Sequence, residues 1–265
     1  MNTPAGQETS LEEIRREIDE IDDSILDLLA RRIEASARIK NGKEGSGTLA
    51  ISPIRPAREA AILRRLMARG QGKVPPQLLV RLWRVILTSS TLFQANVTVH
   101  IPKKLGSRTG LRLKLRDHFG ILPVEEHRDE TQALTQVNIN SGDICVVETA
   151  SSWADAFAQG KAGEARIIGV LPILREEAIP ELLIFGHAHA HSTGDDQTLI
   201  VSNGRLPRDF APQPLWQIKS GSRRISSLPG FLSEHEAPLV PLMRSNATLG
   251  LKVAGRYPVP LEVAS

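Results

Sequence analysis

The chain has 265 residues, of which 41% are hydrophobic and 24% charged, with a formal net charge of +3 at pH 7. This composition is typical of a globular protein long enough for two domains. Aromatic residues make up only 4% of the chain, and its arginines are scattered among acidic residues, which argues against a nucleic-acid partner. No apolar run is long enough to cross a membrane, and the first ten residues do not resemble a signal peptide. Cys145 is the only cysteine, which excludes an internal disulfide and fits a cytoplasmic protein.

The first predicted helix begins at Leu11 and runs to about residue 42. Ser10 and Glu13 form a capping box, which marks the helix start. Apolar residues then recur at alternating steps of three and four, which indicates one buried helix face: Leu11, Ile14, Ile18, Ile21, Ile25 and Leu28. Arg32 continues this series, and burying a cation costs several kcal/mol unless an anion meets it. We interpret Arg32 as binding an anionic ligand inside a helical bundle, with a solvent-directed side chain as the open alternative.

Two further helices are predicted before residue 95. The second begins at Pro56, since proline is favoured at the first helical position, and ends at Gly70. The third spans about residues 76–94, and its apolar face turns polar toward its end: Leu78, Leu82, Ile86, Ser90 and Gln94. Arg58 and Glu59 lie on the same face of the second helix as its apolar residues. Core-facing positions that become polar predict a polar pocket with apolar walls.

The pattern changes to that of an α/β domain at Asn96. Alternating apolar residues at 97–101 predict a strand, and apolar runs follow at 144–147, 167–171, 182–185 and 199–201. Helix-like stretches lie between some of them, at 111–119, 130–137 and 153–159. Strands that alternate with helices indicate an α/β domain. We therefore expect a multidomain protein, with an all-α domain over residues 1–95 and an α/β domain over residues 96–265.

Neither the three histidines at 187–191 nor the cysteine of the second domain predicts a reactive site. His187, His189 and His191 alternate as the residues of one strand face would. Apart from two aspartates at 195–196, no acidic residue or cysteine stands at a spacing from these histidines that is typical of a metal site. We therefore expect an exposed edge strand and no metal. Cys145 lies inside an apolar run and is expected to pack in the core.

Residues 11–94 resemble the all-helical (AroQ-class) chorismate mutases, in which three helices per chain form an intertwined dimer. The resemblance rests on polar positions of the three helices: Arg15, Arg32, Lys43, Arg58, Glu59, Ser90 and Gln94. It implies catalytic roles for Arg32, Lys43, Glu59 and Gln94. It also implies that Arg58 and Ser90 bind substrate, and that Arg15 reaches into the site of the partner chain. Arg55 stands where some members carry aspartate, so recognition of the substrate hydroxyl would depend more on Glu59.

The chemistry of chorismate rearrangement agrees with these residue types. The reaction is intramolecular, so it needs no nucleophile, metal or redox cofactor, and we expect no cofactor. The enzyme must hold a flexible dianion in a compact shape and stabilise charge on the breaking ether oxygen. Arg32 and Lys43 are eleven positions apart, which places them on one helix face about 16 Å from each other. Arg15 lies about 25 Å from Arg32 along the helix, so it can reach the same ligand only from another subunit.

The second domain distantly resembles prephenate dehydratase. Residues 142–148 resemble the strand that precedes a substrate loop there, and residues 197–199 fall where the dehydratases carry Thr-Arg-Phe. The arginine is missing, so the resemblance implies a degenerate domain without dehydratase activity. The expected function is a cytoplasmic, homodimeric chorismate mutase of the shikimate pathway, which supplies prephenate for aromatic amino-acid biosynthesis. The alternatives are an isochorismate-pyruvate lyase, a bifunctional mutase and prephenate dehydratase, and a non-catalytic regulatory dimer that senses an amino acid.

Overall fold

The computed structural model describes residues 10–44, 53–70, 73–175, 177–188 and 191–262, with the backbone alone for residues 39–44. The chain forms two compact units, residues 1–48 and 49–265. The first unit holds one helix, α1 (Leu11–Glu44), among its described residues. Residues 45–52, which follow α1, lie outside the described residues.

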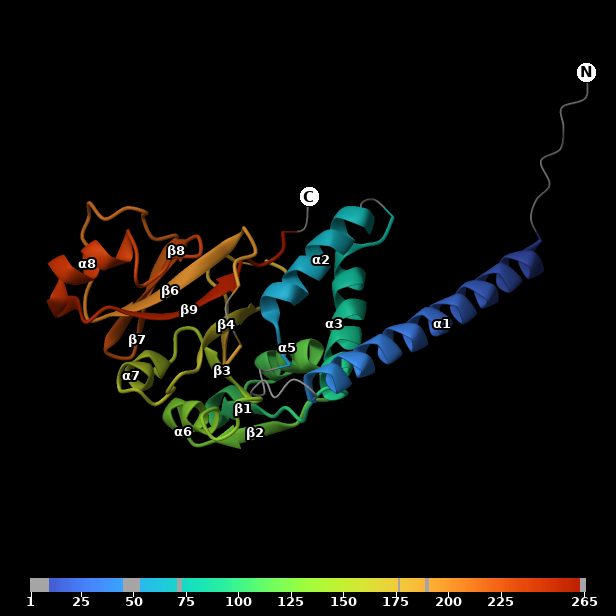
Figure 1. Ribbon diagram of the computed structural model, residues 1–265, viewed down its shortest axis with the longest axis horizontal. Helices are drawn as coiled ribbons and strands as arrows, with labels where there is room; N and C mark the ends of the chain where they lie inside the picture. The colour runs from blue at the N-terminus through green and yellow to red at the C-terminus, as the bar shows by residue number, and fades with distance from the viewer. Residues whose placement is uncertain (1–9, 45–52, 71–72, 176, 189–190, 263–265) are drawn as a thin grey trace, which may run out of the picture. The chain divides into compact units, whose positions relative to one another are not determined.

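Helix α1 is uninterrupted over 34 residues, a length of about 50 Å (Figure 1). The predicted capping box is confirmed, because the backbone N–H of Glu13 donates to Ser10 Oγ at 3.2 Å and that of Ser10 to Glu13 Oε2 at 2.8 Å. The apolar series of α1 is exposed, from 42% at Ile14 to 63% at Leu11. The expected burial of this face is therefore not met within the first unit, because the described part of this unit contains no second element to cover it.

The second unit begins with two helices and continues as an α/β fold. The helices before the first strand are α2 (Pro56–Gly70) and α3 (Pro76–Leu92). The strands are β1 (Val99–Pro102), β2 (Val124–His127), β3 (Ile144–Glu148), β4 (Arg166–Leu171), β5 (Leu182–Gly186), β6 (Asp196–Ser202), β7 (Trp216–Ser220), β8 (Arg223–Pro229) and β9 (Lys252–Pro258). The remaining helices are α4 (Lys103–Gly106), α5 (Thr109–Phe119), α6 (Glu130–Gln136), α7 (Trp153–Ala158), α8 (Leu239–Ser245) and the 3₁₀ turn η1 (Ala247–Leu249).

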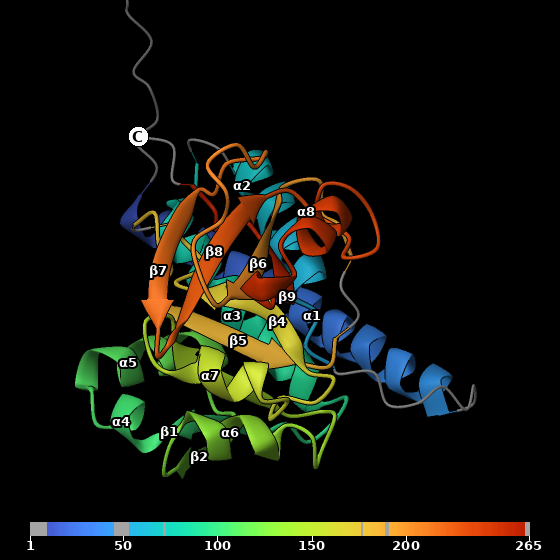
Figure 2. The same cartoon turned by 90° about the vertical axis from the view of Figure 1, so that its left-hand side faces the viewer.

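The strands form one mixed sheet of nine strands in the order β2-β1-β3-β5-β4-β9-β6-β8-β7. Strand β1 runs parallel to β2 and β3, whereas β5 runs antiparallel to both β3 and β4. Figure 2 shows β7 and β8 at one end of the sheet and β1 and β2 at the other. The predicted fold class, an N-terminal helical segment followed by an α/β domain, is confirmed.

One close backbone contact joins the two halves of the sheet. Strands β4 and β9 pair in parallel, with Ile167 opposite Gly255. A Cβ atom at Gly255 would lie 2.1 Å from the carbonyl oxygen of Ile167, far inside contact distance. Only glycine fits this approach, so Gly255 fixes how closely the halves meet.

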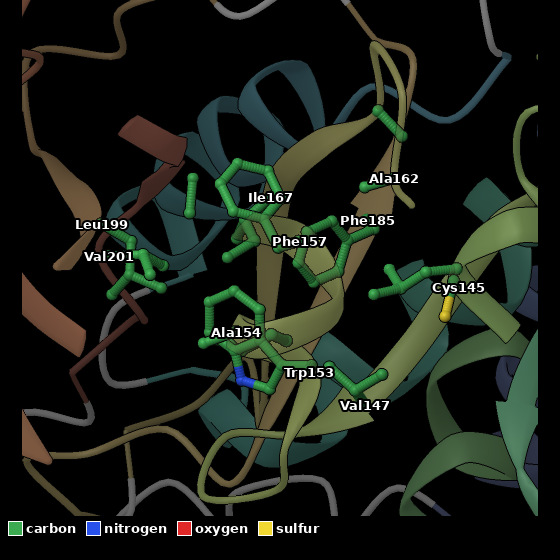
Figure 3. Close-up of a cluster of buried hydrophobic side chains, with 14 of the residues drawn as sticks. Cys145, Val147, Trp153, Ala154, Phe157, Ala162, Ile167, Phe185, Leu199 and Val201 are labelled. Carbon is green, nitrogen blue, oxygen red and sulfur yellow. The ribbon is translucent and has the colours of Figure 1, made fainter. Parts of the chain in front are cut away.

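The largest core cluster lies around three aromatic side chains of the second unit (Figure 3). The rings of Trp153 and Phe185 meet edge to face, with centroids 5.3 Å apart, and Phe157 packs beside both. The indole N–H of Trp153 donates to the carbonyl of Thr149 at 3.0 Å. Cys145 is fully buried in this cluster, and burial raises the pKa of its thiol, so its predicted core role is confirmed.

Helices α2 and α3 pack within the second unit. Leu63 of α2 and Leu79 of α3 are buried in one cluster with Leu261, which follows β9. Arg64 of α2 also donates to Thr193 Oγ1 at 2.9 Å and to the carbonyl of Val259 at 3.0 Å. These contacts attach α2 to the loops around the sheet. The domain boundary near residue 95 stays a prediction.

The expected edge strand of histidines is wrong. Strand β5 ends at Gly186 and lies between β3 and β4 in the sheet interior. His187 and His191 follow the strand in irregular backbone, and His189 lies outside the described residues. Among the helices that the structure describes, none is long and apolar enough to span a membrane.

Candidate active site

Helix α1 carries three of the predicted site residues. Arg15 is exposed in the second turn, and Arg32 lies seventeen positions further along the same straight helix. That separation is about 25 Å, so the two guanidinium groups cannot share one small ligand within a chain. Lys43 lies in the last turn of α1, and its side chain is outside the described residues.

Glu59 is buried at the start of α2 and pairs with Arg84 of α3. The Glu59 carboxylate accepts from Arg84 Nη1, and the two side chains are 12% and 7% exposed. Arg84 also donates from Nη2 to the carbonyl of His118 at 3.0 Å. The pair therefore connects α2, α3 and the end of α5. The carboxylate that is predicted to contact substrate, that of Glu59, already accepts a hydrogen bond from Arg84.

Arg84 is not among the residues predicted from the sequence, although the sequence contains a signal for it. Arg84 stands four positions after Val80 and three before Leu87, both of which are buried on α3. A cation inside an apolar helix face is the same pattern from which Arg32 was predicted to be a site residue. The actual buried face of α3 contains Leu79, Val80, Arg84 and Leu87, whereas the expected face residues Leu78 and Leu82 are each 49% exposed.

Ser90 and Gln94 lie together at the C-terminal end of α3. Ser90 Oγ donates to the carbonyl of Ile86 at 2.8 Å. Gln94 Nε2 donates to the carbonyl of Ser90 at 3.1 Å, and Gln94 stands just beyond the last helical residue, Leu92. Each side chain therefore folds back onto the turn before it. Rotation of the Gln94 side chain would release its amide N–H₂ to a ligand.

Arg58 lies on a different surface, where it lines a cavity of about 490 Å³ with Arg55 and Arg256. Arg256 is half-buried on β9, where desolvation lowers the pKa of its guanidinium, and its Nε donates to the carbonyl of Leu232 at 2.6 Å. The acidic lining residue, Asp196, accepts three hydrogen bonds from Ser192 and Thr193. The cavity is cationic, and the structure brings Arg58 to it rather than to the Glu59–Arg84 pair.

Residues 14–95 match the family model of chorismate mutase type II. This segment is a type II chorismate mutase domain. Every predicted site residue of the mutase domain, from Arg15 to Gln94, lies inside the match. A comparison with curated proteins gives no match.

Two solved structures are similar to this chain at low sequence identity. Prephenate dehydratase from Streptococcus mutans is 11% identical, with a TM-score of 0.36 over 64% of this chain and 100% of the other. A protein described as GqqA, a novel type of quorum quenching acylases, is 12% identical, with a TM-score of 0.38 over 61% of this chain and 95% of the other. At these scores neither similarity carries a conclusion about activity.

Gln197 and Thr198, for which the sequence suggested a likeness to a dehydratase motif, connect strands of the sheet. Gln197 Oε1 accepts from Ser227 Oγ and from the Tyr257 hydroxyl, both at 2.7 Å. Thr198 Oγ1 donates to the carbonyl of Gly230 at 2.7 Å. Both side chains are buried. They connect β6 to its neighbours β8 and β9, and neither supplies a cation.

Proposed function

We propose that the protein is a chorismate mutase, which rearranges chorismate to prephenate. The observation that carries the proposal is the match of residues 14–95 to the type II mutase family, which includes every polar position expected of the site. Arg32 would bind a substrate carboxylate through its two-pronged guanidinium. Lys43 and Gln94 would donate to the ether oxygen as its bond breaks, where charge develops. Glu59 would accept from the substrate hydroxyl, with Ser90 as a further substrate contact. Arg58 would bind substrate only after its side chain leaves the cavity that it lines with Arg55 and Arg256.

A second copy of the chain completes the proposed site. The apolar face of α1 is about half exposed along most of its length, as are Leu78 and Leu82 of α3. Exposed apolar surface on this scale is typical of an interface, and a homodimer would bury it. The same arrangement would bring Arg15 of one chain to Arg32 of the other, which one chain alone cannot do.

The proposed enzyme acts in the cytoplasm without a cofactor, as part of aromatic amino-acid biosynthesis. Its α/β domain has no dehydratase activity of its own. Expulsion of the hydroxyl group from prephenate, with loss of carbon dioxide, needs cationic partners for the carboxylates and an acid for the leaving group. The buried Gln197 and Thr198 provide no charge.

Turnover assays with chorismate and isochorismate test this proposal. The full-length protein should consume chorismate and release prephenate, with no salicylate from isochorismate and no phenylpyruvate above the uncatalysed background at neutral pH. Salicylate would identify a lyase, and phenylpyruvate a bifunctional enzyme. No turnover together with calorimetric binding of phenylalanine or tyrosine would identify a regulatory dimer.

A neighbouring pair of arginines provides a matched control. Arg32→Ala should lower kcat/KM about 10²- to 10³-fold, because a charged contact to the transition state is lost. Arg31 is exposed on the adjacent position of α1, and Arg31→Ala should stay within about twofold of the unmodified enzyme, as expected for a surface residue. Equal effects of the two substitutions would contradict the assigned role of Arg32.

A further inference from the structure

Three potential metal ligands converge at the β2 edge of the sheet, outside the segment that matches the mutase family. His100 lies on β1, and Glu125 and His127 lie on β2. The parallel register pairs His100 with Glu125, and residues two apart on a strand share one face. His100 Nδ1 is 2.9 Å from His127 Nε2 and 3.7 Å from Glu125 Oε2. One ligand atom from each residue lies within 4.8 Å of the others.

A buried aspartate fixes the orientation of the His100 ring. Asp143 Oδ2 lies 3.2 Å from His100 Nε2, and its other oxygen accepts from the backbone N–H of Thr98 at 2.8 Å. Asp143 is 6% exposed and His100 is 4% exposed. A carboxylate at Nε2 favours the proton on that nitrogen, so the lone pair of Nδ1 points toward His127 and Glu125. Histidines that bind metals commonly have such a carboxylate on the other ring nitrogen.

We propose that His100, Glu125 and His127 bind a divalent transition-metal ion of the zinc class. Two imidazoles and one carboxylate are a donor set that zinc accepts, with water in the fourth position. Tetrahedral coordination at zinc–nitrogen distances near 2.0–2.1 Å separates ligand atoms by about 3.3 Å. The observed separations of 2.9 and 3.7 Å lie on either side of that value. Glu125 is 62% exposed, so it can adjust and water can reach the ion.

The ion would connect the edge strand of the sheet to its neighbour. Strand β2 pairs only with β1 among the described strands. Its residues are exposed apart from the half-buried His127. It therefore has little apolar burial of its own to hold it. A metal that bridges β1 and β2 would supply a cross-link at that place, independently of the mutase reaction.

Titration of the chelator-treated, full-length protein with Zn²⁺ and with Co²⁺ tests this proposal. We expect one equivalent of Co²⁺ to bind with the visible absorption of a tetrahedral site, and Zn²⁺ to displace it. Glu125→Gln and His127→Gln should each weaken binding at least tenfold. Glu125 is an exposed side chain, so its variant should fold as the unmodified chain does, which circular dichroism would verify.

Two control variants separate this cluster from other histidines. His235 is exposed outside the cluster, so His235→Gln should bind Co²⁺ like the unmodified protein. The triple variant His187→Gln, His189→Gln and His191→Gln should also retain Co²⁺ binding. The proposal would be overturned if the unmodified protein bound no Co²⁺. It would also be overturned if binding survived in both Glu125→Gln and His127→Gln but was lost in the triple variant.

Discussion

The buried pair of Glu59 and Arg84 should be one of the main stabilising contacts between α2 and α3. Arg84→Met would leave the Glu59 carboxylate without its cation in a place where the two side chains are 12% and 7% exposed. Removal of one partner of a buried ion pair costs about 3–5 kcal/mol. The carbonyl of His118 would lose its hydrogen bonds from Arg84 but keep that of Thr88 Oγ1, so this adds about 1 kcal/mol or less. We therefore expect a loss of about 3–6 kcal/mol in the free energy of unfolding.

Urea unfolding followed by circular dichroism, at fixed protomer concentration, measures this loss. The double variant Glu59→Met and Arg84→Met should recover most of it, because two apolar side chains bury no unpaired charge. Arg81→Met is the matched control: Arg81 is also on α3 and forms an ion pair with Asp117 of α5, but both side chains are more than half exposed. Its loss should be about 0–1 kcal/mol. Equal losses for Arg81→Met and Arg84→Met, or additive single losses in the double variant, would refute the reasoning.

Three further predictions concern the contact between β4 and β9, the partly buried His118 and the mutase site. Gly255→Ala should destabilise the protein by about 1–3 kcal/mol through the contact with Ile167, whereas Gly110→Ala, where nothing lies within 4 Å, should be nearly neutral in the same unfolding assay. Burial, followed by the charge of Arg84, lowers the pKa of His118 well below its ordinary value. As pH falls, the imidazole of His118 is therefore protonated at a higher pH in the unfolded chain than in the folded protein. The free energy of unfolding should fall as pH drops below about 6.5, by at most about 1.4 kcal/mol per pH unit. The fall should be shallower in His118→Gln. Gln94→Glu should move the optimum of mutase activity to lower pH, because a carboxyl group donates to the ether oxygen only when protonated; an unchanged pH profile in an active variant would argue against that contact.

Helices and strands were predicted best from the sequence where a proline or glycine marks their ends or where an apolar run is continuous. Pro56 and Gly70 delimit α2 as expected, and the apolar runs at 144–147 and 182–185 became β3 and β5. Strand β2 was missed because its Val-Glu-Glu-His sequence has one apolar residue and lies largely exposed at the sheet edge. Strand β8 was missed because its buried face includes serines, such as Ser227, whose hydrogen-bonding partner is a side chain on another strand.

Only part of the candidate site could be predicted from the sequence. Arg84 interrupts a buried apolar face, so helical periodicity alone could have found it. Its pairing with Glu59 depends on how α2 packs on α3, which no local pattern specifies. The cluster of His100 and His127 likewise depends on the parallel register of β1 and β2, because the two rings meet only through that pairing.

Mixing of two inactive variants tests the central claim, a mutase site completed by a second chain. Arg15→Ala and Arg32→Ala should each have little activity alone, because each lacks one carboxylate contact. After complete exchange at equal concentrations, about half of the dimers are mixed, and each mixed dimer has one intact site. The account predicts recovery of about a quarter of the unmodified activity, since one site in four is then intact. No recovery, with subunit exchange demonstrated by native mass spectrometry, would contradict it.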